Sequence, residues 1–327
     1  MAHEFASGRR ARLAWRGRPR GRPEAPGQAG RAGGSALGVA AVIAATVCWG
    51  SGSVLGKAVD APGLVVSFWR LWMGGLFLLA VLYLTGRRLD WRTVLRCVPG
   101  GVFFGVNVAF FFSAIRHTTI ANAQIIGSLA PVLVLPFAVR WFGERITRTS
   151  IVCAALAIVG VVIVTLSGQP GVGGRSTFGD LLAAASLVSW TAFFLVTKQV
   201  RRTTGTLEYL ATMTTVAAIT VTPVTLLTGQ DLGQIQGTGW LWLILLILVP
   251  GSSGHGLMTW AHAHVDVSVS SVLTLGEPIL ATILAAMFLG ESVTLLQVAG
   301  IAVVIVSLAM LALRAPALTP EPLEASG

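Results

Sequence analysis

Charged side chains are scarce in this sequence. Only 11% of its 327 residues are Asp, Glu, Lys or Arg, and 54% are hydrophobic, whereas about 25% of the residues in a soluble domain are charged. The mean hydropathy is correspondingly high, at +0.78. This composition excludes an ordinary water-soluble domain and predicts that most of the chain lies in a lipid bilayer.

Cysteines and nucleotide-binding motifs are also few or missing. The three cysteines, Cys48, Cys97 and Cys153, lie within or at the edge of apolar runs, so a disulfide framework is not expected. No Gly-Lys-Ser or Gly-Lys-Thr follows the Gly-rich stretch 168–177, and the chain therefore lacks a P-loop there. We expect no cofactor and no ATP-driven activity of its own.

The net charge of +10 does not indicate a nucleic-acid partner. Eight of the 23 Lys and Arg lie in the first 36 residues, and most of the others flank apolar runs, where membrane topology places basic residues. Residues 1–36 are rich in Arg, Gly and Pro. We expect them to form a disordered basic tail rather than a secretory signal, because the first apolar run is long enough to span a membrane.

Ten apolar runs follow, each near the ~20 residues that a helix needs to cross the hydrocarbon. Helices are required because a backbone facing lipid must satisfy its own hydrogen bonds. The predicted fold class is an all-α polytopic membrane protein with ten transmembrane helices. The expected spans cover residues 37–57, 63–84, 97–115, 120–142, 150–167, 178–198, 207–228, 239–262, 267–289 and 295–313.

The chain contains two copies of one unit. The stretch Ala114–Glu144 returns as Ala261–Glu291, with Pro131 and Pro278 at equivalent positions, an offset of 147 residues. Five spans in each copy is an odd number, so the copies would insert with opposite orientation. This predicts two inverted five-helix repeats, an architecture whose substrate site in secondary transporters lies near the midplane between the repeats.

The predicted organisation follows from these copies. We expect a first five-helix repeat over 37–167, a linker over 168–177, a second five-helix repeat over 178–314 and a tail over 315–327.

Basic residues in the loops predict the orientation in the membrane. With the N-terminus in the cytoplasm, ten Lys and Arg fall in cytoplasmic loops and two in loops of the opposite side, so both termini are expected to be cytoplasmic. The ten are Arg87, Arg88, Arg92, Arg96, Arg145, Arg148, Lys198, Arg201, Arg202 and Arg314, and the two are Arg116 and Arg175. We therefore predict a multi-pass protein of the cytoplasmic (cell) membrane.

Several short motifs recur at equivalent places in the two copies. Each copy has a Trp early in its first helix, and in its fourth helix a mid-helix Pro and a Gly-Glu ending; the first copy also has an Arg in its second helix. These residues are Trp49, Trp190, Pro131, Pro278, Gly143-Glu144, Gly290-Glu291 and Arg70. The chain from about residue 37 to 314 thereby resembles the drug/metabolite transporter superfamily, EamA type. The resemblance implies ten helices in two repeats and export of small metabolites through a central cavity.

Glu277 is the sharpest functional candidate. A carboxylate at mid-depth costs at least ~2.5–3.5 kcal/mol and is tolerated where it faces a cavity or a partner. Such a group could carry a proton reversibly and couple transport to it. Alternatively, Glu277 accepts hydrogen bonds from a neighbouring helix and only holds the repeats together. The next residue, Pro278, cannot donate to the helix ladder, so a helix kink is expected there and at its equivalent, Pro131.

Six further residues are candidates for the substrate cavity. Arg70 could bind an anionic group or pair with Glu277, or it could extend to the headgroups. The remaining five are aromatic or polar side chains that could contact substrate, or that could pack or hydrogen-bond between helices instead. They are Trp49, Asn107, Gln124, Trp190 and His255.

Two other motifs do not have the geometry that catalysis or metal binding requires. The run Gly251-Ser-Ser-Gly254 resembles the motif of intramembrane serine proteases, but His255 lies two residues beyond Ser253, about 200° around the same helix, and cannot serve as its base. His255 and His262 are ~10 Å apart along a helix, too far for one metal ion, and no metal site is expected. Small-xxx-small patterns such as Gly101–Gly105 would permit a homodimer but also packing within one bundle.

The function predicted from the sequence is secondary active transport, the export of small metabolites or drugs by alternating access in the membrane, with a proton as a candidate coupling ion. The chain is not expected to be an enzyme. The alternatives are a membrane-embedded enzyme and a non-transporting membrane partner of a larger assembly. The expected partners are a small-molecule metabolite and the lipid bilayer.

Overall fold

A computed structural model describes residues 28–118, 120–167, 176–289 and 293–314. Within this part of the chain, ten helical spans are long and apolar enough to cross a membrane. This confirms the predicted all-α fold class with ten transmembrane helices. The spans are Ala36–Ala58, Gly63–Leu84, Trp91–His117, Ala123–Phe142, Arg148–Leu166, Thr177–Val200, Thr206–Leu227, Gly239–Ala261, Val267–Leu284 and Leu295–Arg314.

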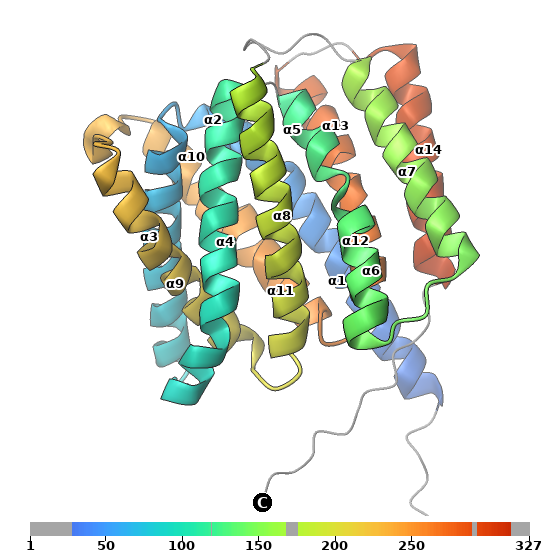
Figure 1. Ribbon diagram of the computed structural model, residues 1–327, viewed down its shortest axis with the longest axis horizontal. Coiled ribbons are helices and arrows are strands. Elements are labelled where there is room, and N and C mark those ends of the chain that lie inside the picture. The colour runs from blue at the N-terminus through green and yellow to red at the C-terminus, as the bar shows by residue number, and fades with distance from the viewer. Residues whose placement is uncertain (1–27, 119, 168–175, 290–292, 315–327) are drawn as a thin grey trace, which may run out of the picture.

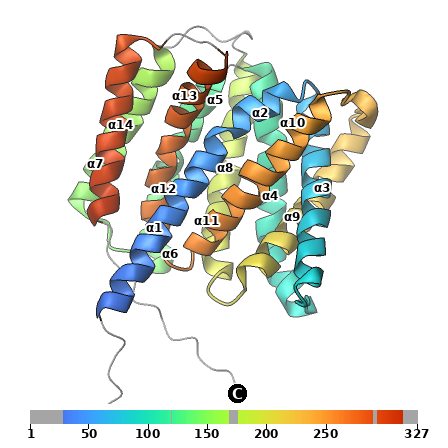
Figure 2. The same ribbon diagram turned by 180° about the vertical axis from the view of Figure 1, so that it is seen from behind.

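The helices lie side by side in one bundle (Figures 1 and 2). Their bounds are α1 (Gln28–Gly50), α2 (Gly52–Ala58), α3 (Gly63–Leu84), α4 (Trp91–His117), α5 (Ile120–Gly127), α6 (Ala130–Phe142), α7 (Arg148–Leu166), α8 (Thr177–Val200), α9 (Thr206–Leu227), α10 (Gly239–Leu246), α11 (His255–Ala261), α12 (Val267–Leu273), α13 (Glu277–Leu289) and α14 (Leu295–Arg314). Most of the expected linker 168–177, the tail 315–327 and the Gly290-Glu291 motif lie outside the described residues.

Two helices begin earlier than their apolar runs predict. α1 begins at Gln28, inside the expected tail. α4 begins at Trp91 rather than near residue 97, because Asp90 caps it by accepting a hydrogen bond of 2.9 Å from the backbone N–H of Thr93. A capped, polar first turn can project from the hydrocarbon, so a search for apolar runs misses it.

Four spans are broken in the middle. The first passes from α1 to α2, the fourth from α5 to α6, the eighth from α10 through a π-helical turn, Ile247–Gly254, to α11, and the ninth from α12 through a 3-10 turn, Thr274–Gly276, to α13. Pro131 and Pro278 lie in the first turn of the helix that follows a break. Proline is favoured in that place because its missing N–H has no intrahelical acceptor there.

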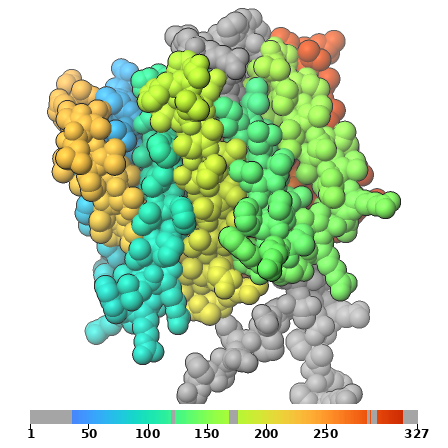
Figure 3. Space-filling model, viewed as in Figure 1, coloured from blue at the N-terminus to red at the C-terminus, as the bar shows by residue number. Residues whose placement is uncertain are grey.

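The pairing of helices follows the proposed duplication. α4 packs against α8, and its counterpart, the eighth span, packs against α1; α3 pairs with α9, and α7 with α14. If each helix is replaced by its equivalent in the other unit, the α4–α8 pair becomes the pair of the eighth span with α1. The α3–α9 and α7–α14 pairs each stay the same. In space-filling view, α4, α8, α6 and α7 pack closely over one side of the bundle (Figure 3).

Glycines permit several of these close approaches. A Cβ on Gly101 or on Gly105 would lie 2.8 Å from a carbonyl oxygen of α9, that of Met213 or Ala217 respectively. This small-xxx-small pattern is therefore used inside the bundle.

The start of α1 and the end of α14 lie on the same side of the bundle, the lower side in Figure 1. We call this side the termini face and the opposite side the far face. The connections α3–α4, α6–α7, α8–α9 and α11–α12 also lie at the termini face, since successive spans run in opposite directions.

We predict that Gly160→Leu lowers the stability of the bundle by about 1–3 kcal/mol, the usual cost of overpacking. A Cβ on Gly160 of α7 would lie 2.9 Å from the carbonyl oxygen of Gly300 of α14. Thermal unfolding in detergent measures the effect. Val159→Leu is the control, because Val159 is 53% exposed on the outside of the bundle; equal losses in both variants would contradict the close α7–α14 contact.

Candidate functional site

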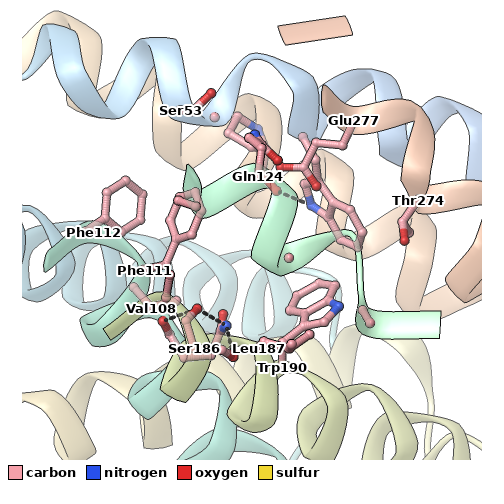
Figure 4. Close-up of a pocket in the computed structure, with 18 of the residues that line it drawn as sticks. Ser53, Val108, Phe111, Phe112, Gln124, Ser186, Leu187, Trp190, Thr274 and Glu277 are labelled. Carbon is pink, nitrogen blue, oxygen red and sulfur yellow. Dashed lines mark hydrogen bonds between the residues drawn. The ribbon is translucent and has the colours of Figure 1, made fainter. Parts of the chain in front are cut away.

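A cavity lies in the middle of the bundle, between the two units (Figure 4). It comprises about 1030 Å³ of space not filled by atoms, part of it open to the outside. All four broken spans contribute to its wall. Of the residues singled out in the sequence, those that line it are Trp49, Arg70, Asn107, Gln124, Trp190, His255, Glu277 and Pro278. Pro131 is not among the lining residues, although the preceding residue, Ala130, is.

Aromatic rings form one side of this cavity. The rings of Trp49 and Trp190, from the first helix of each unit, meet edge to face with their centroids 5.1 Å apart. His255 lies against Trp49 at 4.9 Å and against Phe104 at 4.6 Å. The indole N–H of Trp49 donates to the carbonyl oxygen of Pro250 at 3.2 Å, and so its single donor is occupied. This wall offers mainly π surface to a bound molecule.

Arg70 and Glu277 face the same cavity without touching each other. The Arg70 guanidinium lies over the Phe112 ring, 5.2 Å from its centroid, and the residue is 8% exposed. Its place in the cavity wall excludes the alternative in which it extends to the headgroups. No ion pair within 4.0 Å joins it to Glu277, although each charge acts on the other across the cavity. Within the described residues, neither side chain has a hydrogen-bond partner.

The two amide candidates differ in what they contact. The amide nitrogen of Asn107 donates to the carbonyl oxygen of Ser186 at 3.0 Å and to its hydroxyl at 2.9 Å. Asn107 therefore bridges α4 and α8, the structural alternative considered for it. The amide nitrogen of Gln124 is buried with no acceptor in the described part of the chain. Such a group is rare in proteins and is available to a ligand.

The sequence of the chain matches a known family. The EamA-like transporter family matches the chain twice, over residues 36–166 and 177–313. The chain belongs to the EamA-like transporter family. The resemblance drawn from the motifs is thereby confirmed, and this EamA-family protein is a multi-pass membrane transporter.

Relatives with sequence similarity carry the same description. An uncharacterized transporter of Archaeoglobus fulgidus is 28% identical over 261 residues, which are 80% of this chain and 91% of that protein. A second uncharacterized transporter of the same organism is 32% identical over 90 residues, 27% of this chain and 32% of that protein. One crystal structure superimposes with a TM-score of 0.72 at 21% identity, covering 85% of this chain and 97% of the other; it shows the likeness of the fold alone.

Several cavity residues of the EamA-family protein were not identified from its sequence. At least one Ser, Thr or Phe occurs in every apolar run, so their identity alone carries no signal. Those that line the cavity are Ser53, Phe104, Phe111, Phe112, Ser128, Ser186 and Thr274.

The two motifs set aside in the sequence analysis lie beside or below this cavity. Ser252 is in the π-helical turn, and its hydroxyl has no partner within the described residues, His255 included. The described residues contain no group of three His, Cys, Asp or Glu placed to hold a metal ion.

Between the cavity and the termini face the bundle is packed with apolar side chains. Val134, Phe194, Met258 and Val267 belong to this cluster, which draws on both units. His262 is 2% exposed, stacks edge-on against Phe194 at 4.4 Å, and has no hydrogen-bond partner in the described part of the chain.

Asp266 lies just below this packed layer, between the eighth and ninth spans. Its partial burial and the nearby charge of Glu144 raise the pKa of Asp266 from 3.8 to about 6, and the charge of Lys198 acts in the opposite direction. The ionised form of Asp266 therefore destabilises the folded protein.

We predict that Asp266→Asn raises the unfolding temperature at pH 7 and that this gain shrinks as the pH falls to 4. Because the folded pKa of Asp266, about 6, lies above its ordinary value of 3.8, its cost is full above the folded pKa and vanishes below the ordinary one. Thermal unfolding in detergent across this pH range measures the gain.

Asp90→Asn serves as the control with the opposite sign. The Thr93 hydroxyl and N–H donate to Asp90 and lower its pKa, so this variant should lose stability at pH 7 and less at pH 4. A gain in stability for Asp266→Asn that does not change with pH would contradict the raised pKa of Asp266.

Proposed function

We propose that this protein is a secondary active transporter that exports small metabolites across the cytoplasmic membrane by alternating access. The observation that carries the proposal is the central cavity, walled by aromatic, polar and charged side chains of both units. A site between two repeats is the arrangement used by transporters whose halves rock around a central substrate.

The proposed mechanism needs two inverted units with cytoplasmic termini. The helix pairs that persist when the units are exchanged support the inversion. The ten basic residues enumerated above lie in the loops and helix ends on the termini face, which supports a cytoplasmic position for this face.

We also propose that the substrate has an anionic group next to an apolar body. Arg70 is a buried cation with no hydrogen-bond acceptor among the described residues, and Gln124 adds a buried amide donor. A guanidinium placed in this way can bind a carboxylate or phosphate with two parallel hydrogen bonds. The Trp49–Trp190 pair would cover the apolar part.

We predict that Arg70→Gln raises the half-saturating concentration for anionic substrates by about 10–100-fold, since hydrogen bonds between charged groups contribute about 1.5–3 kcal/mol. Counterflow of a labelled metabolite pool in proteoliposomes measures it. Neutral members of the pool should be affected much less. A uniform loss for neutral and anionic compounds would indicate a purely structural role for Arg70.

Glu277 is proposed to carry the coupling proton. It begins α13 beside the break in the ninth span, and no described residue donates a hydrogen bond to it. Binding or releasing a proton there changes the charge that Arg70 and a substrate meet in the cavity. A carboxylate in this position can therefore exchange a proton against a substrate.

We predict that Glu277→Gln abolishes transport driven by a pH gradient while leaving counterflow, which needs no net proton movement, largely intact. The substitution preserves size and removes only the titration. Glu208→Gln, a change of a carboxylate at the termini face, is the matched control. Gradient-driven transport that persists in Glu277→Gln would refute the coupling role.

The counterflow assay also tests the transport function as a whole. An absence of counterflow in the parent protein with every metabolite pool would favour the non-transporting alternatives.

A further inference from the structure

Glu144 connects the two units at the termini face. It follows α6 directly after Gly143, whose left-handed backbone (φ 65°) turns the chain back toward the bundle. Its carboxylate accepts the backbone N–H of Val267 at 2.8 Å with one oxygen and that of Ser268 at 2.9 Å with the other. The residue is 8% exposed. A side chain of the first unit thus caps α12 of the second unit.

This cap replaces one that the sequence offers locally. The first N–H groups of a helix have no partner within the helix, and a negative charge stabilises that end. Asp266 occupies the capping position of α12, and Asp is among the best capping residues. Its side chain makes no capping hydrogen bond. The start of α12 therefore depends on a residue that is distant in the chain and moves with α6.

Lys198 adds a third helix to the same junction. Its ammonium group donates to the carbonyl oxygen of Val265, two residues before α12 begins, at 2.7 Å, and Lys198 is 7% exposed. It also attracts the carboxylates of Glu144 and Asp266. The ends of α6 and α8 are thereby joined to the beginning of α12.

The junction lies beyond the packed layer that separates the cavity from the termini face. Trp190 in the cavity wall and Lys198 are eight residues apart on α8, about 12 Å along the helix. α6 and α12 are packed against each other over this depth. A path from the cavity to the termini face cannot form along them unless they separate, and separation breaks both hydrogen bonds of Glu144.

We propose that Glu144 is a latch that keeps the cavity closed toward the termini face, and that releasing its two hydrogen bonds is a required step in opening that face. The inference rests on the alternating access proposed above. In this proposal, the contact that closes the termini face is formed by the Glu144 carboxylate and two backbone N–H groups of the ninth span. That span also contains Glu277.

The test measures how fast a cysteine in the cavity reacts with a membrane-impermeant maleimide added from each side of sealed vesicles. Ser53→Cys, a nearly isosteric change in the cavity wall, is the reporter in a protein whose Cys48, Cys97 and Cys153 are replaced by Ala. Glu144→Ala should raise the rate of labelling from the termini face about tenfold or more. Glu144→Gln keeps one acceptor oxygen and should give a smaller increase.

Val267→Pro tests the same hydrogen bond from the other end. It removes one N–H donor and leaves the charge of Glu144 in place. Proline is favoured at the first position of a helix, and Asp266 has φ −60° and ψ 140°, a conformation suited to the residue before proline. Labelling from the termini face should rise. In the Glu144→Ala background, Val267→Pro should add little, because the bond is already absent.

Glu208→Ala is the matched control. Glu208 also joins the two units at the termini face, through an ion pair of 2.9 Å with Arg87, but the Arg87 side chain is 52% exposed. Labelling should stay at the level of the parent protein. An equal increase in this variant, or an unchanged rate in Val267→Pro and in the Glu144 variants that fold, would overturn the latch. Val267→Pro decides the question if the Glu144 variants do not fold.

The labelling assay needs no substrate, so the two proposals can fail separately. Labelling that depends on Glu144 without any counterflow would refute the transport function and leave the latch in place. Counterflow together with labelling that is independent of Glu144 would refute the latch alone.

Discussion

The rest of this structure depends on one constraint: in a bilayer the backbone must satisfy its own hydrogen bonds. Unbroken helices can face lipid, whereas a broken helix must turn its break toward protein or toward a lined cavity. All four broken spans contribute residues to the central cavity. At one break, the indole of Trp49 donates to the carbonyl oxygen of Pro250. Prolines lie at three of the four breaks, at Pro131, Pro250 and Pro278, and so help to determine where the cavity forms.

Buried polar groups of this protein differ in whether the surrounding protein offers them a partner. Asn107, Lys198 and Glu144 have protein partners and connect helices. Arg70 and Gln124 line the cavity, and the side-chain nitrogen of Gln124 has no protein acceptor among the described residues. An unpaired buried polar group destabilises a fold, and among the described residues such groups lie both in the cavity wall, at Gln124, and outside it, at Thr212 and His262. The amides of Asn107 and Gln124 thus differ in whether the surrounding protein offers them a partner.

The two units are similar in architecture but not in chemistry. Glu277 of the second unit is at the position equivalent to Ala130 of the first, and both line the cavity. The cavity consequently contains one acid from this pair of positions, and Arg70 of the first unit is a cation that lines the same cavity. Duplication supplies two units of similar architecture, and the differences between them give the cavity wall an uneven distribution of charge.

The sequence by itself determined the number of spans, the duplication, the family and the residues worth examining, because hydropathy and internal similarity are local properties of the chain. Only the tertiary structure decided which helix faces meet, since an almost uniformly apolar helix carries little information about its buried side. It brought Trp49, Trp190 and His255 together, and paired Asn107 with Ser186. It also placed Glu144 on a helix end 123 residues away, a contact that depends on how the packed units are oriented and that no short motif encodes.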